Sequence, residues 1–132
     1  MNNIVAIAHD AKKPELAQFI QDRLEWLRGV NLIATGRTAE FIESQGLSCK
    51  HMSPGQSGGY VQITQMIEEG NVDMVIFLRD HKVIQKHHED IRKLLEACNV
   101  KNIPLATNYA SAELIILGLL KKQAIERSKR KE

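Results

Sequence analysis

The most constraining feature of this sequence is an apolar run, VIFL at residues 75–78, that gives way abruptly to charged residues. A run of β-branched and aromatic residues without polar alternation is typical of a strand buried on both faces, and such strands lie at the centre of parallel sheets. In open α/β sheets, ligands bind beyond the carboxyl ends of the strands. The polar segment RDHKVIQKHHED (79–90) would therefore lie at the ligand-binding edge. We expect Asp80, His87 and Asp90 at any active site.

Strand and helix patterns alternate along the rest of the chain. Further apolar runs predict strands at 4–8, 32–34, 49–52 and 103–107. Apolar residues at helical spacing predict helices near 14–27, 41–46, 61–69, 91–98 and 110–120. This alternation predicts an α/β fold, a three-layer α/β/α arrangement around a five-stranded, mainly parallel sheet. We find no linker or internal repeat, so we expect a single domain over 1–132 that ends in a basic tail at 121–132.

Composition excludes several function classes. A formal net charge of +2 and an aromatic content of 5% are too low to indicate nucleic-acid binding. Cys49 and Cys98 lack metal-ligand spacing, which favours reduced thiols in a cytosolic protein. The first apolar run, 4–8, is too short for a signal peptide or a membrane span. We therefore expect a cytoplasmic protein without nucleic-acid or membrane partners.

Polar residues fall directly after each predicted strand. His9 and Asp10 follow the first strand, TGRT (35–38) the second, SPGQSGG (53–59) the third and TN (107–108) the last. Because parallel strands bring their carboxyl ends to one edge, these segments should gather there with the charged segment of the central strand. Helix N-termini and glycine-rich backbone bind anions, phosphate above all. The residues alone therefore predict a phosphorylated small molecule handled by acid–base chemistry.

Each of these features also has a structural explanation. The spacing in GQSGG matches neither a Walker loop nor the dinucleotide fingerprint, so a flexible turn is as probable as a phosphate cradle. Asp10 and Asp80 are equally suited to capping. The adjacent histidines in HHED point different ways and lack further ligands, so we predict no metal site. His87 is either an acid–base group oriented by Asp90 or a solvated loop residue. The basic tail either solubilises the chain or reaches a neighbouring subunit's anion site.

Several motifs, in order along nearly the whole chain, resemble the methylglyoxal synthase family. They are AHDAKK (8–13), ATGRT (34–38), PGQSGGY (54–60), DMVIFLRD (73–80), QKHHED (85–90) and IPLATNYASAE (103–113). The resemblance implies conversion of dihydroxyacetone phosphate to methylglyoxal and inorganic phosphate through an enediol(ate), without a metal or organic cofactor. It also implies a homo-oligomer, often a hexamer.

The resemblance also implies roles for individual residues. His9 and Asp10 match the pair that follows the family's first strand. Asp80 matches the family's acidic residue. His87 matches the histidine that contacts the substrate oxygen, and Asp90 matches the aspartate that supports this histidine. The phosphate-binding positions correspond to Lys13, Thr35, Thr38 and the backbone N–H of Gly55. Arg130 matches a C-terminal arginine that reaches a neighbouring subunit's site.

The sequence departs from the family in the loops around the expected phosphate site. Tyr60 stands where the family's GGD loop has the aspartate assigned as catalytic base, Pro54 replaces a serine, and Arg37, a strong phosphate ligand, replaces a threonine. A phenol, with an ordinary pKa of about 10, is a poor base near neutral pH. The resemblance favours a methylglyoxal synthase-type lyase in which Asp10 or Asp80 takes over proton abstraction. The alternatives are a non-catalytic, phosphate-ligand-binding regulatory domain, as in carbamoyl phosphate synthetase, and a related lyase for another phosphorylated sugar.

Overall fold

The computed structural model describes residues 2–83 and 88–130, except for the side chains of Gln56 and His88. Its centre is a five-stranded sheet in the order β3-β2-β1-β4-β5. The strands are β1 (Asn3–Ala8), β2 (Asn31–Thr35), β3 (Lys50–Met52), β4 (Met74–Leu78) and β5 (Leu105–Ala106). Every pair of neighbouring strands is parallel, which confirms the predicted sheet.

The chain starts in the middle of the sheet and builds outward in both directions. β1 pairs with β2 on one side and β4 on the other, so that Ala6 lies opposite both Ala34 and Ile76. β4 is buried along its whole length, as its apolar run predicts. The direction in which strands are added reverses between β1 and β4. The carboxyl ends of these two strands therefore form the switch point at which open α/β sheets bind ligands.

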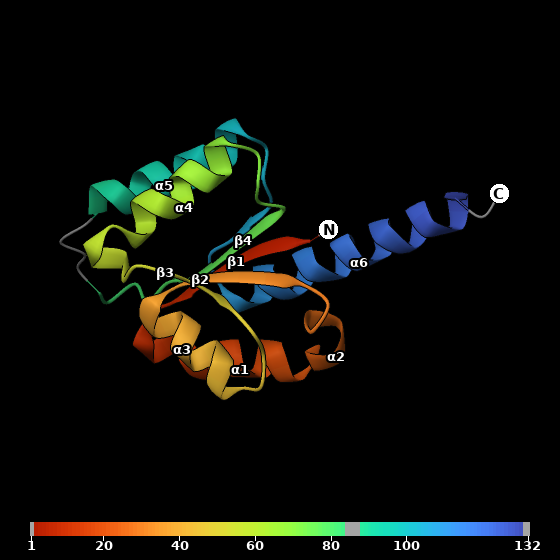
Figure 1. Ribbon diagram of the computed structural model, residues 1–132, viewed down its shortest axis with the longest axis horizontal. Helices are drawn as coiled ribbons and strands as arrows, with labels where there is room; N and C mark the ends of the chain where they lie inside the picture. Colours follow the sequence, from red (N-terminus) through yellow and green to blue (C-terminus); the bar gives the residue numbers. More distant parts are fainter. Residues whose placement is uncertain (1, 84–87, 131–132) are drawn as a thin grey trace.

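Helices cover both faces of the sheet and complete the three predicted layers (Figure 1). On one face, α4 (Gly59–Glu68) and α5 (His88–Val100) pack on alternate strand residues that include Val5 and Phe77. On the other face, α1 (Lys13–Gln21), α3 (Gly36–Ser44) and α6 (Tyr109–Arg130) pack on residues that include Ile4 and Ile76. Successive strand residues point to opposite faces, so each strand contributes to both cores.

The helix predicted over 14–27 is interrupted. α1 ends at Gln21, and a single helical turn, α2 (Leu24–Leu27), follows. Between them Arg23 leaves helical geometry, with φ −137° and ψ 27°. Its guanidinium donates to the carbonyl oxygen of Phe19 at 3.1 Å and pairs with Glu113 of α6. The break therefore coincides with an ion pair that joins α1 to α6.

The connections at the sheet edge are more regular than predicted. A 3-10 turn, η1 (Asp10–Lys12), follows β1, and α3 begins directly after β2 rather than near residue 41. The glycine-rich segment contains another 3-10 turn, η2 (Gly55–Ser57), and Gly58, at φ 102°, turns the chain into α4. Only glycine adopts this left-handed geometry without strain. Two helix N-termini, those of α3 and α4, consequently lie at the carboxyl edge of the sheet.

The basic segment predicted as a tail is helical as far as Arg130. Residues 121–130 contain strong helix formers and no glycine or proline. Arg127, Lys129 and Arg130 occupy the last turn, where positive charge complements the helix dipole. In Figure 1 this half of α6 extends away from the sheet. None of the described helices has an apolar stretch long enough to cross a membrane.

Candidate active site

A cavity of about 490 Å³ opens at the carboxyl ends of β1, β2 and β4. Most of the predicted site residues line it: His9, Asp10, Lys13, Thr35, Arg37, Thr38, Gly55, Tyr60 and Asp80. Residues far apart in the sequence meet there because the parallel strands end at the same edge of the sheet.

Backbone N–H groups without acceptors face this end of the sheet. Thr35 is the N-cap of α3, with extended backbone (φ −71°, ψ 155°) and no side-chain capping bond. The first N–H groups of a helix lack acceptors within the helix, and none of the described residues accepts from those of Gly36, Arg37 and Thr38. The N–H of Gly55 likewise has no acceptor within the described part of the chain. Together with the positive end of the α3 dipole, these donors suit a phosphate group.

The hydroxyl group of Thr38 is committed to the fold. It accepts a hydrogen bond from the N–H of Ala8 at 3.2 Å and donates to the carbonyl oxygen of the same residue at 3.4 Å. Thr38 is buried, so this contact fixes the start of α3 against the end of β1. The backbone N–H of Thr38, rather than its hydroxyl, is the group that remains for a ligand.

Two cations flank the cavity and share one carboxylate. The Nζ atom of Lys13 lies 3.0 Å from both the Ala8 carbonyl oxygen and Asp10 Oδ1. The other carboxylate oxygen, Asp10 Oδ2, lies 3.2 Å from Arg37 Nη2. The hydrogen bond from Lys13 and its charge, with a smaller contribution from Arg37, hold the pKa of Asp10 below its ordinary value. Within the described chain Asp10 caps neither a helix nor a turn, and each of its carboxylate oxygens pairs with one of these cations.

His9 and Asp80 meet at the ends of β1 and β4. The backbone N–H of Asp80 donates to His9 Nδ1 at 2.8 Å. A ring nitrogen that accepts a hydrogen bond carries no proton, so the proton of the neutral imidazole is on Nε2. Burial, followed by the charge of Arg79, lowers the pKa of His9. The Asp80 carboxylate accepts from the N–H of Lys82 at 2.9 Å, so the predicted capping role is present, in a turn.

Tyr60 forms an aromatic wall of the cavity. Its side chain is buried, and its ring stacks on Phe77 with 5.8 Å between centroids and 20° between planes. A Cβ atom at Gly55 would lie 2.5 Å from Tyr60 Cζ, so the ring packs directly on the glycine backbone. Burial raises the pKa of Tyr60, and the phenol is therefore neutral near pH 7.

Two predicted residues of the described chain do not line this cavity. Asp90 lies in the first turn of α5 and Arg130 in the last turn of α6, and neither lines the cavity. His87 lies outside the described residues. Within residues 2–83 and 88–130, no group of His, Cys, Asp or Glu side chains has the arrangement of a metal site.

The sequence interpretation passed over Arg79. Its guanidinium carbon lies 5.8 Å from the centre of the Phe77 ring, and its charge acts on both His9 and Tyr60. The signal was present in the sequence, because Arg79 is two residues from Phe77 and strand periodicity puts such residues on one face.

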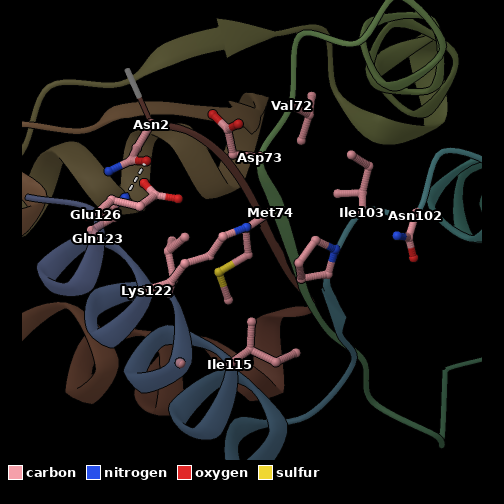
Figure 2. A pocket seen from close by; sticks show the side chains of 13 residues that line it. Asn2, Val72, Asp73, Met74, Asn102, Ile103, Ile115, Lys122, Gln123 and Glu126 are labelled. Atoms are coloured by element: carbon pink, nitrogen blue, oxygen red, sulfur yellow. Dashed lines mark hydrogen bonds between the residues drawn. The ribbon is translucent and has the colours of Figure 1, made fainter. Parts of the chain in front are cut away.

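A larger cavity of about 760 Å³ lies at the opposite edge of the sheet, where residues preceding β1, β4 and β5 face α6 (Figure 2). Asn2 accepts a hydrogen bond from Gln123 at 2.7 Å across it. Its charged lining residues are Asp73, Lys122 and Glu126. With two carboxylates to one ammonium group and no helix N-terminus, this cavity is less suited to phosphate than the first.

Comparison with known proteins identifies the family. A family model described as an MGS-like domain matches residues 15–107. A methylglyoxal synthase of Ralstonia nicotianae is 44% identical over 117 residues, which are 88% of this chain and 87% of the relative. One from Caldicellulosiruptor saccharolyticus is 47% identical over 118 residues, 89% and 84% of the two chains. This chain belongs to the methylglyoxal synthase family. A crystal structure of methylglyoxal synthase from Elizabethkingia anophelis NUHP1 matches with a TM-score of 0.79 and 36% identity, covering 86% of this chain and 76% of that one.

Membership of the methylglyoxal synthase family makes the geometry of Tyr60 significant. The sequence resemblance aligns Tyr60 with the aspartate assigned as the family's base. Here that position carries a neutral ring held between Phe77 and the backbone of Gly55. The carboxylates that line the described cavity are those of Asp10 and Asp80.

Proposed function

We propose that this protein is a methylglyoxal synthase-type lyase that converts dihydroxyacetone phosphate to methylglyoxal and inorganic phosphate. The observation that carries the proposal is the convergence, in one cavity, of a carboxylate and a neutral imidazole with backbone donors that have no acceptor among the described residues. An anion site alone requires neither the carboxylate nor the imidazole. The family to which the chain belongs supports the same chemistry.

In this proposal the phosphate group binds at the start of α3. The N–H groups of Gly36, Arg37 and Gly55 donate to its oxygens, as helix N-termini and glycine-rich turns do for anions. Lys13 and the side chain of Arg37 add positive charge, and in this structure both form ion pairs with Asp10. A phosphate dianion would compete with Asp10 for both cations.

Of the two candidate bases, Asp80 is better placed than Asp10. Both oxygens of Asp10 are paired with cations, and its lowered pKa makes it a weak proton acceptor. Asp80 uses Oδ1 to accept from the N–H of Lys82, and Oδ2 has no partner within the described residues. Its backbone is also hydrogen-bonded to His9, which places a proton acceptor and a proton donor side by side.

The chemistry then proceeds in balanced steps. Asp80 removes a proton from the hydroxymethyl carbon beside the carbonyl group, and the Nε2–H of His9 stabilises the negative charge that develops on the carbonyl oxygen. The resulting enediolate expels phosphate by breaking its C–O bond, and the hydroxyl proton goes to the departing phosphate. The enolate that remains takes up a proton from solvent on its methylene carbon and becomes methylglyoxal, and Asp80 releases its proton to solvent.

Paired carboxamide variants test this assignment. Loss of a positioned general base lowers turnover by roughly 100- to 10,000-fold, so Asp80→Asn should lower methylglyoxal formation from dihydroxyacetone phosphate by that range. The retained side-chain oxygen still accepts from Lys82, so the turn is preserved. Asp10→Asn should affect KM more than kcat, because Asp10 pairs with the phosphate-binding cations. Equal turnover in wild type and Asp80→Asn would contradict the assignment.

We further propose that the protein is a cytoplasmic homo-oligomer. Leu114 and Leu117 of α6 are 72% and 57% exposed, which favours a neighbouring subunit on this face. Such a neighbour would also give Arg130 a site to reach. Cys49 and Cys98 are free thiols, which accords with a reducing compartment.

A further inference from the structure

The buried ring of Phe77 supports three functional groups behind the cavity. The imidazole of His9 meets its edge, with 5.6 Å between centroids and 78° between planes. Tyr60 stacks on it at 5.8 Å, and the guanidinium carbon of Arg79 lies 5.8 Å from its centroid. Phe77 is fully buried, so all three side chains are arranged around a ring in the core.

The backbone at the end of β4 is anchored on both sides. The N–H of Arg79 donates to the carbonyl oxygen of Thr107 at 3.3 Å, and that of the next residue, Asp80, donates to His9 Nδ1 at 2.8 Å. The N–H of His9 in turn donates to the carbonyl oxygen of Leu78 at 3.1 Å. A peptide donor held in this way cannot turn into an acceptor, so protonation of His9 on Nδ1 would break the bond.

We propose that Arg79 is a positioning residue that keeps His9 as a neutral imidazole with its proton on Nε2. The fixed peptide N–H of Asp80 selects the tautomer, and the guanidinium of Arg79 opposes a second positive charge beside the shared ring. This role goes beyond the lyase assignment, which requires only that His9 donate a hydrogen bond.

The other charged groups that face His9 act in opposite directions. Lys13, from the start of α1, opposes protonation of the imidazole together with Arg79, whereas Asp80 and Asp10 favour it. Tyr60, from α4, is uncharged near neutral pH. Among the described residues, Arg79 is the charge with the largest effect, second to burial, and both lower the pKa of His9.

The catalytic consequence rests on the proposed function. A neutral imidazole can donate a hydrogen bond to a developing oxyanion, and some proton-transfer enzymes use one in this way. The lowered pKa of His9 keeps Nδ1 unprotonated, and its bond to the Asp80 N–H intact, down to a lower pH than an ordinary histidine would. Without the charge of Arg79, His9 would become protonated at a higher pH than in wild type, and the bond that orients the ring beside Asp80 would be lost there.

Nitrogen-15 NMR of the histidine rings in the substrate-free protein tests the proposal. In wild type, His9 should show the Nε2–H tautomer and a titration midpoint below that of an ordinary histidine. Arg79→Met should move the midpoint upward, and Arg79→Lys, which keeps the charge, should restore most of the wild-type value. Arg92→Met is the matched control, because Arg92 pairs with Glu89 and Glu96 on α5, and it should leave His9 unchanged.

An unchanged midpoint in Arg79→Met, or the same upward shift in Arg79→Lys, would overturn the role of Arg79. A proton on Nδ1 of wild-type His9 would overturn the tautomer assignment. This measurement needs no variant, so it remains possible even if Arg79→Met does not fold. The measurement needs no turnover. A protein without lyase activity can therefore still confirm or refute this inference, and an active one can still fail it.

Discussion

Replacing Tyr60 by aspartate restores a carboxylate at the family's base position, and its effect on stability follows from the packing. The ring is 6% exposed and stacks on Phe77. Truncating a buried aromatic residue costs about 3–5 kcal/mol, and a carboxylate in the first turn of α4 regains about 0.3–1 kcal/mol from the helix dipole. We expect Tyr60→Asp to lower the free energy of unfolding by about 2–5 kcal/mol, measured by urea denaturation.

The same variant should gain activity. Position 60 lies in the first turn of α4, and its side chain lines the cavity beside Gly55. Asp80 already serves as the proposed base, so the gain is only the advantage of the family's base position over that of Asp80. We expect methylglyoxal formation to rise at least about tenfold over wild type, a fraction of the roughly 100- to 10,000-fold that a positioned base contributes. The assay is methylglyoxal formation from dihydroxyacetone phosphate at a temperature where the variant is folded.

Tyr60→Phe is the control, because it keeps the ring and removes the hydroxyl group. That hydroxyl makes no hydrogen bond to the residues that the structure describes, so the free energy of unfolding should change by less than about 1 kcal/mol. Turnover should stay at the wild-type level, since a buried neutral phenol does not act as the base. If Tyr60→Phe abolishes turnover and Tyr60→Asp does not improve it, Tyr60 is itself catalytic and the reasoning fails.

Further predictions concern packing, phosphate binding and assembly. Gly59→Ala should lower the free energy of unfolding by about 1–3 kcal/mol or more, because its Cβ would lie 2.1 Å from a backbone oxygen. Gly118→Ala, by contrast, should stabilise α6 by about 0.5–1 kcal/mol, because its Cβ would meet no other atom. Lys13→Met removes a charge-assisted hydrogen bond and should weaken phosphate binding by roughly 10- to 150-fold, measured by calorimetry. Unchanged affinity would exclude Lys13 from the site. Light scattering should give an oligomer for wild type and a smaller species for Leu114→Gln/Leu117→Gln, and a wild-type monomer would remove the assembly proposal.

The architecture was predictable because hydrophobic periodicity reports directly on burial. The apolar run in β4 indicated a strand buried on both faces, and the alternation of strands and helices indicated the parallel sheet that is observed. Helix boundaries were predicted less well. The break at Arg23 coincides with an ion pair to Glu113, which is 90 residues away in the sequence. The helical tail accords with the absence of glycine and proline after Leu120.

Which strand ends meet at one edge of the sheet was predictable, whereas the state of the groups there was not. Parallel strands that end at one edge brought His9, Asp10 and Asp80 together, as expected. Nothing in the sequence indicated that the hydroxyl of Thr38 is bonded to the backbone of β1, or that Asp10 is paired through both oxygens. These hydrogen bonds and ion pairs depend on the positions of separate elements to within a few tenths of an ångström, and local sequence patterns do not encode those positions.

Phosphorus NMR of the wild-type protein with dihydroxyacetone phosphate distinguishes a lyase from a ligand-binding domain. The substrate resonance should be replaced by that of inorganic phosphate, and methylglyoxal trapped in parallel samples should accumulate in equal amount. The rate should scale with protein concentration and fall with added phosphate, which competes for the start of α3. A protein that binds phosphate but releases none from the substrate would contradict the lyase and identify a ligand-binding domain on the same fold.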